Sequence, residues 1–206
     1  PSINWFATFL DYSEILGTLA TCIRDRNSTM TILPVALLTV SDSRSLEDDP
    51  SGDLLRDSIV SAGHRLMDRF LVRDDVYAIR AQVSNWIADP SIQVIITTGG
   101  TGFTGRDSTP EALLPLFDKE ISGFGELFRQ LSYAEVGTST LQSRATGGIA
   151  NGTLIFALPG SKGAVTLGWN EILLKQLDSG HRPCNFAELI PRFLEHLKIP
   201  GGDKTA

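Results

Sequence analysis

Three short apolar runs in this sequence each lead directly into a polar or glycine-rich loop. Residues 31–40 are rich in Val, Leu and Ile without strict alternation of polar and apolar positions, as expected of a strand buried on both faces of a parallel sheet. Residues 94–96 and 153–158 are shorter runs of the same kind. Buried strands of this type need helices on both faces, so the pattern predicts an α/β fold.

The segments between these runs carry helical signals. Residues 76–88 place their apolar side chains at helical spacing, and Pro90 follows as a terminator. Thr109 is expected to be an N-cap, with Pro110 as the first helical residue. Further helices are predicted at residues 53–62, 126–136 and 164–177, and a further strand at 66–72. This alternation predicts a three-layer α/β/α sandwich with a mostly parallel sheet.

Composition limits the kinds of partner. Lys and Arg total 18 against 24 Asp and Glu, so the formal charge is 18 − 24 = −6, which repels a phosphate backbone and argues against nucleic-acid binding. Cys22 and Cys184 are the two cysteines, without the paired spacing of a zinc site or a disulfide framework. A reducing, cytoplasmic location is therefore expected.

The 206 residues suit one domain with tails, which we place at residues 30–197. Residues 1–29 are interpreted as an N-terminal extension, possibly non-native, because Met30 directly precedes the first convincing strand. Asp11 and Glu14 interrupt its apolar positions, so no signal peptide and no stable membrane insertion is expected, although an amphipathic helix would fit. Residues 198–206 are interpreted as a flexible tail.

The three loops that follow the apolar runs form the predicted site. In open α/β sheets the carboxyl ends of the strands share one edge, so these loops can converge on one crevice. Its predicted members are Ser41, Asp42, Ser43, the loop from Gly99 to Asp107, and Pro159, Gly160 and Ser161.

The loop Gly99-Gly100-Thr101-Gly102 has almost no side chains, so its backbone amides can approach phosphate oxygens even in an acidic protein. It is neither a Walker A sequence nor the dinucleotide fingerprint, and a plain tight turn is the alternative. Downstream, Arg106 can neutralise a phosphate and Asp107 can hold a magnesium ion beside a helix start. The alternative for Asp107 is that it merely caps a turn.

Several ordered motifs resemble the molybdopterin-binding family that includes MoaB, MogA and the homologous domains of plant Cnx and animal gephyrin proteins. The resemblance covers roughly residues 32–186, and residues 77–83, 137–144 and 182–186 are more similar to the bacterial MoaB branch than to MogA. The motifs are Thr39-Val40-Ser41-Asp42-Ser43, Asp49-x-Ser51-Gly52, residues 97–110, Leu141-Gln142-Ser143-Arg144 and Leu158-Pro159-Gly160.

This resemblance implies a homo-oligomer, either trimer or hexamer, that binds molybdopterin and adenine nucleotide. Active relatives transfer AMP from MgATP to the terminal phosphate of molybdopterin and release pyrophosphate. Their two catalytic aspartates correspond to Asp74 and Asp107, which would also be the Mg²⁺ ligands, although Arg73 and Asp75 depart from the usual Pro-Asp-Glu element. Asp74 or Asp75 could instead cap the following helix.

The resemblance also assigns binding roles to Ser143 and Arg144, for which a subunit interface is the competing use, and to the start of the helix at Ser161 and Lys162. Two other functions stay open. A non-catalytic molybdopterin-binding or carrier protein of the MoaB branch would keep the pocket without adenylylation, and a nucleotide hydrolase would consume ATP without any pterin.

Overall fold

The structure, a computed structural model, describes residues 30–197. The predicted extension at residues 1–29 and the predicted tail at 198–206 lie outside the described residues. Within residues 30–197, no helix combines the length and the apolar character needed to cross a bilayer.

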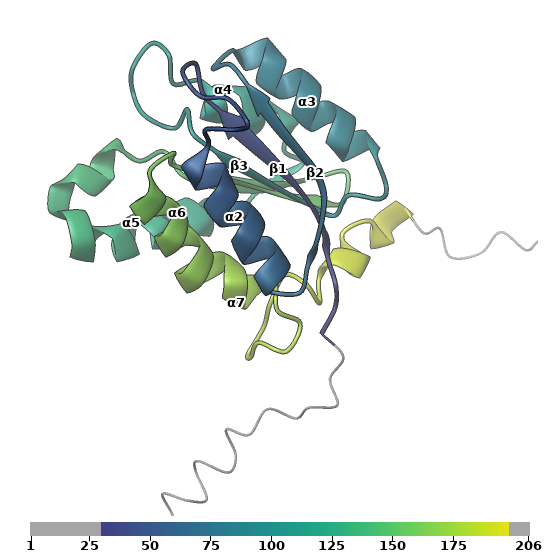
Figure 1. Cartoon of the computed structure of the whole chain (residues 1–206). Helices are drawn as coiled ribbons and strands as arrows, with labels where there is room; N and C mark the ends of the chain where they lie inside the picture. The colour runs from purple at the N-terminus through teal and green to yellow at the C-terminus, as the bar shows by residue number, and fades with distance from the viewer. Residues whose placement is uncertain (1–29, 198–206) are drawn as a thin grey trace, which may run out of the picture. The chain divides into compact units, whose positions relative to one another are not determined.

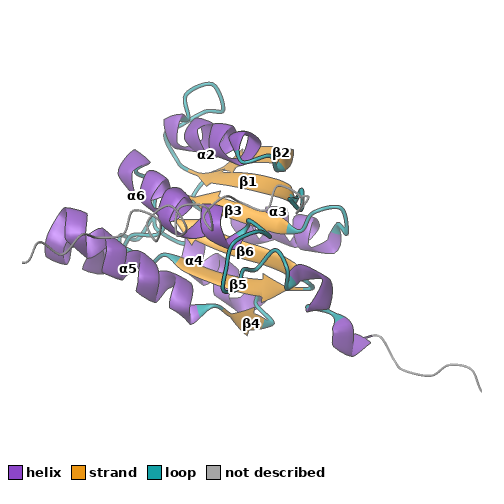
Figure 2. Ribbon diagram, turned by 90° about the horizontal axis from the view of Figure 1, so that it is seen from below, coloured by secondary structure: helices purple, strands orange, loops and turns teal. Residues whose placement is uncertain are grey.

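A six-stranded sheet forms the middle layer (Figure 1), and Figure 2 shows its strand order β2-β1-β3-β6-β5-β4. The first four strands in this order run parallel, whereas β5 and β4 are antiparallel to their neighbours. The predicted mostly parallel sheet is therefore confirmed. The strands are β1 (Pro34–Val40), β2 (Arg65–Val72), β3 (Val94–Thr98), β4 (Lys119–Glu120), β5 (Thr146–Ala150) and β6 (Thr153–Leu158).

Helices cover both faces of the sheet, which confirms the three-layer sandwich (Figure 2). One face is covered by α2 (Pro50–Ser61), α5 (Ser122–Val136), α6 (Lys162–Leu167) and α7 (Leu174–Gln176), with a π-helical stretch at Gly168–Leu173 between α6 and α7. The other face is covered by α3 (Val76–Ala88) and α4 (Thr109–Leu113). Four short 3₁₀ helices occupy Leu114–Leu116, Gly137–Gln142, Ile190–Arg192 and Glu195–Leu197.

Alternate residues of the central strands pack into two separate hydrophobic cores, one on each face of the sheet. In β1, Val35 and Leu37 pack under α2, α5 and α6, whereas Ala36 and Leu38 pack under α3. Both faces of the strand are buried, so apolar side chains are favoured in both sets. This explains why β1, β3 and β6 are mainly apolar, with threonines only at their ends or next to them.

The structure corrects several predicted boundaries. Helix α2 begins at Pro50 rather than at residue 53, because the Asp49 carboxylate caps it by accepting a hydrogen bond from the Gly52 amide. The predicted N-cap role of Thr109 is wrong: Ser108 holds that position without a side-chain bond to the helix amides, and the Thr109 hydroxyl donates to the Gly99 carbonyl. Smaller differences are that β1 begins at residue 34 rather than 31, β3 runs on to residue 98, α5 begins at 122 and the helix predicted at 164–177 occupies 162–176.

The β5–β6 hairpin was not predicted. Its turn is formed by Asn151 and Gly152, which both have positive φ, at 46° and 81°. Such a pair is the usual signal of a two-residue hairpin turn, so the sequence did contain the information. The glycines of β5, Gly147 and Gly148, weakened the strand pattern before that turn.

Candidate functional site

The carboxyl ends of β1, β3 and β6 lie next to one another in the sheet. Thr98 of β3 is in register with Thr39 of β1 and Leu158 of β6, so the loops that follow the three strands start side by side. The Gly99 amide donates to the Leu158 carbonyl at 3.0 Å and so ties two of these loops together. The structure therefore places the three predicted loops at one edge.

A cavity of about 530 Å³ opens at this edge. This volume is within the usual range for small-molecule sites. Of the residues predicted for the site, it is lined by Gly99, Gly100, Thr101, Gly102, Asp107, Ser143, Pro159, Gly160 and Ser161. Ser41, Asp42, Ser43, Asp74, Arg106 and Arg144 do not line it.

Helix α5 and the 3₁₀ helix after it supply a cavity wall that sequence reasoning missed. Ser132, Glu135, Ser139 and Gln142 bring hydroxyl, carboxylate and amide groups to this wall, and Phe128 and Leu167 bring apolar surface. The polar residues at positions 132 and 135 on one side of a helix were the available signal, but a helix with a polar stripe is usually a solvent-facing one.

Glycine is required at two positions of the loop after β3. Gly99 and Gly100 have φ of +100° and +63°, and a Cβ at Gly99 would lie 2.1 Å from the Val40 carbonyl oxygen. A Cβ at Gly100 would lie 2.4 Å from the Thr109 hydroxyl and 2.5 Å from Asp74 Oδ2. The loop therefore lies tightly against both β1 and the Asp74 carboxylate, so the turn itself requires these glycines, as the tight-turn alternative expected.

Asp74 is not a helix cap. The neighbouring Asp75 fills that role, because its carboxylate accepts from the amides of Tyr77 and Ala78. Asp74 Oδ1 instead accepts from the amide and hydroxyl of Ser108, at 2.9 and 2.5 Å. Within residues 30–197, Asp74 Oδ2 accepts no hydrogen bond and faces the Gly100 turn.

Asp107 lies on the other side of the same turn. A Cβ at Gly102 would lie 2.7 Å from Asp107 Oδ2, and this oxygen accepts from the amide and hydroxyl of Thr104 at 2.8 and 2.6 Å. Asp107 does close the 102–107 loop, as the alternative interpretation expected, and it also lines the cavity. Both carboxylates thus flank the glycine turn.

Their surroundings shift the pKa values of these two carboxyls in opposite directions. Burial raises the pKa of Asp74, and the nearby charges of Asp107 and Asp42 add to the increase against the opposing Ser108 hydrogen bonds. Burial acts to raise the pKa of Asp107, but hydrogen bonds from Thr104 and the Gly102 amide, together with the Arg144 charge, outweigh it and lower the pKa overall. Asp107 is therefore firmly ionised, whereas Asp74 is a carboxylate that a nearby cation would stabilise.

The loop after β1 meets the glycine-rich loop through an ion pair. Arg106 Nη2 lies 2.6 Å from Asp42 Oδ2, and the Asp74 amide donates to Asp42 Oδ1 at 3.4 Å. The Ser43 amide donates to the Ser41 hydroxyl in the same turn. This group adjoins Asp74 outside the cavity lining, and its roles in ligand binding stay predictions.

Arg144 holds the glycine-rich loop through all three of its guanidinium nitrogens. Nε donates to the Gly102 carbonyl at 2.7 Å, Nη2 donates to the Asp107 carbonyl at 2.9 Å, and Nη1 pairs with the Glu111 carboxylate. The guanidinium also lies over the Phe103 ring. Arg144 therefore already contacts protein oxygens on both sides of Asp107, a role that the sequence did not indicate.

The carboxylates fit one kind of metal ion. Across the part of the chain that the structure describes, no cluster of three or more His, Cys, Asp or Glu side chains is arranged to hold a metal. Mg²⁺ does not need such a cluster, because it is commonly bound by one or two carboxylates together with water and substrate phosphates. Asp74 and Asp107 beside an amide-lined turn match that requirement and do not match a metal held by protein alone.

Comparison with known proteins gives a consistent result. Residues 36–179 match a family model described as a probable molybdopterin binding domain. The chain is 59% identical over 152 residues to molybdenum cofactor biosynthesis protein B of Escherichia coli K12, covering 74% of this chain and 89% of that protein. It is 44% identical over 146 residues to the protein of the same name from Bacillus cereus, covering 70% and 85%.

Solved structures show the same similarity. A crystal structure of molybdenum cofactor biosynthesis protein B superimposes with a TM-score of 0.70 at 42% identity, covering 71% of this chain and 92% of that one. The tungsten cofactor synthesizing protein MoaB from Pyrococcus furiosus superimposes with a TM-score of 0.61 at 35% identity, covering 82% and 99%.

Proposed function

The chain belongs to the molybdopterin-binding family of molybdenum cofactor biosynthesis proteins, and we propose that it transfers AMP from MgATP to the terminal phosphate of molybdopterin. One observation carries the proposal: Asp74 and Asp107 lie on either side of a glycine turn whose amides can reach phosphate oxygens, beside a cavity of about 530 Å³. A transferase of this kind has to bring two anions together, and this edge of the sheet offers both amides and a cation site for them.

The reaction balances without a base from the protein. An oxygen of the molybdopterin phosphate attacks the α-phosphorus of ATP, the bond from that phosphorus to the bridging oxygen breaks, and pyrophosphate leaves with the bonding electrons. A phosphate monoester is already largely ionised near neutral pH, because its second pKa is about 6. The protein therefore needs to position the two phosphates and offset their charge, rather than to remove a proton.

Asp74 and Asp107 are the residues that would hold Mg²⁺. Bound there, the ion would offset charge on the ATP phosphates. Asp74 offers Oδ2, which is free of protein donors among the described residues, and the Ser108 bonds fix the direction of the carboxylate. Thr104 fixes Asp107 in the same way. Both carboxylates are thus oriented before any ligand arrives.

The cavity provides suitable groups for the pterin. Hydroxyls of Ser132, Ser139 and Ser143 and the Gln142 amide can hydrogen-bond to a heterocycle, while Phe128 and Leu167 supply apolar surface. The amides of Gly100 and Thr101, which donate to no protein acceptor within residues 30–197, would then receive phosphate oxygens at the border between cavity and carboxylates.

An anaerobic adenylylation assay tests the proposal. Purified protein given MgATP and molybdopterin is expected to release pyrophosphate and form the adenylylated pterin. Asp107→Ala should reduce the rate about 100-fold or more, because it removes one of the two carboxylates that would hold Mg²⁺ on the reacting phosphates. Asp48→Ala is the matched control, since Asp48 lies exposed in the loop before α2. Wild-type protein that binds molybdopterin without making product would contradict the proposal.

The similarity to proteins named molybdenum cofactor biosynthesis protein B supports a second candidate, a non-catalytic molybdopterin carrier. A carrier would use the cavity alone, so Asp74→Asn, at a carboxylate that does not line the cavity, would leave its molybdopterin affinity almost unchanged. The same assay separates a nucleotide hydrolase, which would consume ATP when molybdopterin is left out.

A further inference from the structure

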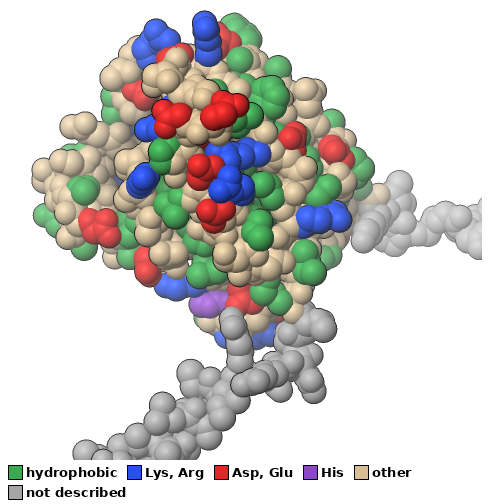
Figure 3. Space-filling view, viewed as in Figure 1, with side chains coloured by type: hydrophobic (Ala, Val, Ile, Leu, Met, Phe, Trp, Pro, Cys, Tyr) green, Lys and Arg blue, Asp and Glu red, His purple; other side chains and the backbone are tan. Residues whose placement is uncertain are grey.

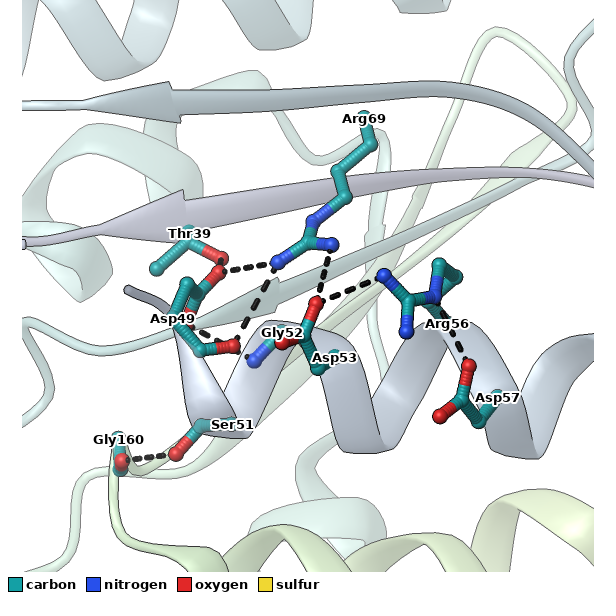
Figure 4. Close-up of polar contacts among 9 residues, drawn as sticks. All are labelled: Thr39, Asp49, Ser51, Gly52, Asp53, Arg56, Asp57, Arg69 and Gly160. Atoms are coloured by element: carbon teal, nitrogen blue, oxygen red, sulfur yellow. Dashed lines mark hydrogen bonds and ion pairs between the residues drawn. The ribbon is translucent and has the colours of Figure 1, made fainter. Parts of the chain in front are cut away.

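The Asp49-Pro50-Ser51-Gly52 element at the start of α2 does not line the cavity, yet it contacts a loop that does. Ser51 is 4% exposed, and its hydroxyl donates to the Gly160 carbonyl at 2.8 Å (Figure 4). Gly160 belongs to the loop between β6 and α6 and lines the cavity. A buried hydroxyl on one helix thus holds the backbone of a cavity wall.

A second hydroxyl holds the neighbouring carbonyl of that wall. Thr98, at the end of β3, donates from its hydroxyl to the Pro159 carbonyl at 3.2 Å. The only cis peptide among the described residues is Arg182-Pro183, so the peptides that follow Pro159 and Gly160 are trans. A trans peptide points its N–H opposite to its C=O. The Gly160 amide therefore points away from Thr98, and the Ser161 amide points away from Ser51. Within residues 30–197, neither amide donates to a protein acceptor.

Ser51 is itself held in place by a buried network. The Asp49 side chain is 0% exposed and accepts from the Thr39 hydroxyl at 2.6 Å, from the Gly52 amide at 2.9 Å and from Arg69 Nη2 at 2.9 Å. A Cβ at Gly52 would lie 1.9 Å from Asp49 Oδ2, so only glycine lets this carboxylate close onto the helix. Figure 4 shows the two ends of the network, with Arg69 on one side of the α2 start and Gly160 on the other.

We infer that Ser51 is a positioning residue of the cavity: it fixes the Gly160 carbonyl and so keeps the Gly160 and Ser161 amides free for a phosphate of the bound ligand. The identity of that ligand rests on the proposed function, whereas the hydrogen bond from Ser51 to the Gly160 carbonyl does not. This role accounts for the whole Asp49-Pro50-Ser51-Gly52 element, because Asp49 and Gly52 fix the turn from which Ser51 reaches the loop.

The test uses ¹⁵N-labelled whole protein, with inorganic pyrophosphate as the phosphate probe and molybdopterin as the proposed ligand under anaerobic conditions. Ser51→Ala should shift the amide signals of Gly160 and Ser161 and weaken pyrophosphate and molybdopterin binding about 10-fold, as expected for a buried acceptor left unpaired. Thr98→Val, which removes the other hydroxyl at nearly constant volume, should affect the same two signals. Ser61→Ala is the control, since Ser61 is exposed at the other end of α2.

Each outcome decides one claim. Unchanged Gly160 and Ser161 signals in both Ser51→Ala and Thr98→Val would overturn the inference. Variants that are less stable than wild type but bind pyrophosphate with unaltered affinity would overturn it too. If Ser51→Ala does not fold, Thr98→Val carries the test alone. If wild-type protein binds pyrophosphate but not molybdopterin, the proposed function fails while the positioning role is still decided by the amide signals and pyrophosphate affinity.

Discussion

Asp74 and Asp107 have the same side chain but opposite pKa shifts, and this difference follows from their neighbours. Asp107 is surrounded by donors from Thr104, whereas Asp74 is partly buried beside the charges of Asp107 and Asp42. Residues that perform chemistry are commonly held in such unfavourable surroundings. Asp74 is therefore expected to limit stability and support activity at the same time.

We expect a proton and Mg²⁺ to compete for Asp74. Because its pKa is raised, the carboxylate is protonated over a wider acidic range, so the Mg²⁺ concentration for half-maximal activity should fall as pH rises through the raised pKa and then level off. Magnesium titrations of the adenylylation rate across this range measure the effect. A half-maximal concentration that does not depend on pH would contradict it.

Asp74→Asn should show the stability side of the same property. A group with a raised folded-state pKa stabilises the fold below its unfolded pKa, and this contribution is lost as pH rises through the folded pKa. The variant should therefore be more stable than wild type near pH 7 and gain nothing at acidic pH, while its activity falls about 100-fold. Urea unfolding and the rate assay check both parts. Asp75→Asn is the control, because asparagine keeps the N-cap of α3.

Arg144 provides a second prediction at the residue scale. Lysine keeps the charge but has its donors on a single nitrogen, so it cannot reach the oxygens that Arg144 contacts from three separate nitrogens, and Arg144→Lys should lose bonds to the Gly102 and Asp107 carbonyls. We expect unfolding free energy to fall by about 1–3 kcal/mol and the adenylylation rate to fall with it. Arg192→Lys, in an exposed pair with Glu195, should change either quantity little. Weaker ligand binding at unchanged stability would instead indicate a direct ligand contact.

That the candidate residues gather at one edge of the sheet could be predicted from sequence, but their contacts could not. The carboxyl ends of parallel strands share one edge, so the apolar runs alone place the glycines, aspartates and serines that follow them. The pairing of Arg106 with Asp42, and of Arg144 with Gly102 and Glu111, depends on how distant loops meet. That meeting is set by tertiary packing, which local pattern does not encode.

At the scale of elements, the start of α2 depends on an ion pair with one fully buried partner. Arg69 of β2 contacts both Asp49 and Asp53, and its side chain is 13% exposed (Figure 4). Figure 3 shows acidic and basic side chains gathered on the face over which α2 lies. The pairs on that face differ in burial, so they should differ in their effect on stability.

Arg69→Met should therefore destabilise the protein by about 3–5 kcal/mol, because it leaves the Asp49 charge buried without its partner. Arg56→Met is the matched control on the same surface, since Arg56 pairs with the exposed Asp53 and Asp57 and should contribute less than about 1 kcal/mol. Denaturant unfolding at pH 7 compares the two variants. Equal losses would mean that the Asp49 pair behaves as a surface pair.

Elements built on strong hydrophobic periodicity were predicted well. The bounds of α3 and β6 are as expected, because each has a dense apolar pattern between clear end signals. Helix α2 was placed three residues late because its cap is an aspartate within an acidic run, Glu47-Asp48-Asp49, which reads as a solvated loop. Glu47 and Asp48 are indeed exposed, but Asp49 is buried, and its distant partners Thr39 and Arg69 explain the difference.

At the scale of the molecule, four large apolar side chains remain exposed near the cavity. Phe103, Tyr133, Val136 and Leu141 are 70%, 60%, 50% and 71% exposed, and Val136 also lines the cavity. They come from the glycine-rich loop, the end of α5 and the following 3₁₀ helix. Exposed apolar side chains are a common feature of protein interfaces, so these four are candidates for the interface of the homo-oligomer that the family resemblance implies.

We predict that these side chains lie in the interface of a trimer or hexamer. Leu141→Glu places a charge where an apolar group would be buried, so it should weaken assembly about 100-fold and give monomer at micromolar concentration in sedimentation velocity. Val60→Glu is the control, since Val60 is 58% exposed on α2.

If the interface also supports the cavity wall at Val136, the Leu141→Glu monomer should bind molybdopterin more weakly. A wild-type protein that sediments as a monomer would remove the premise, and a Leu141→Glu oligomer would place the interface elsewhere.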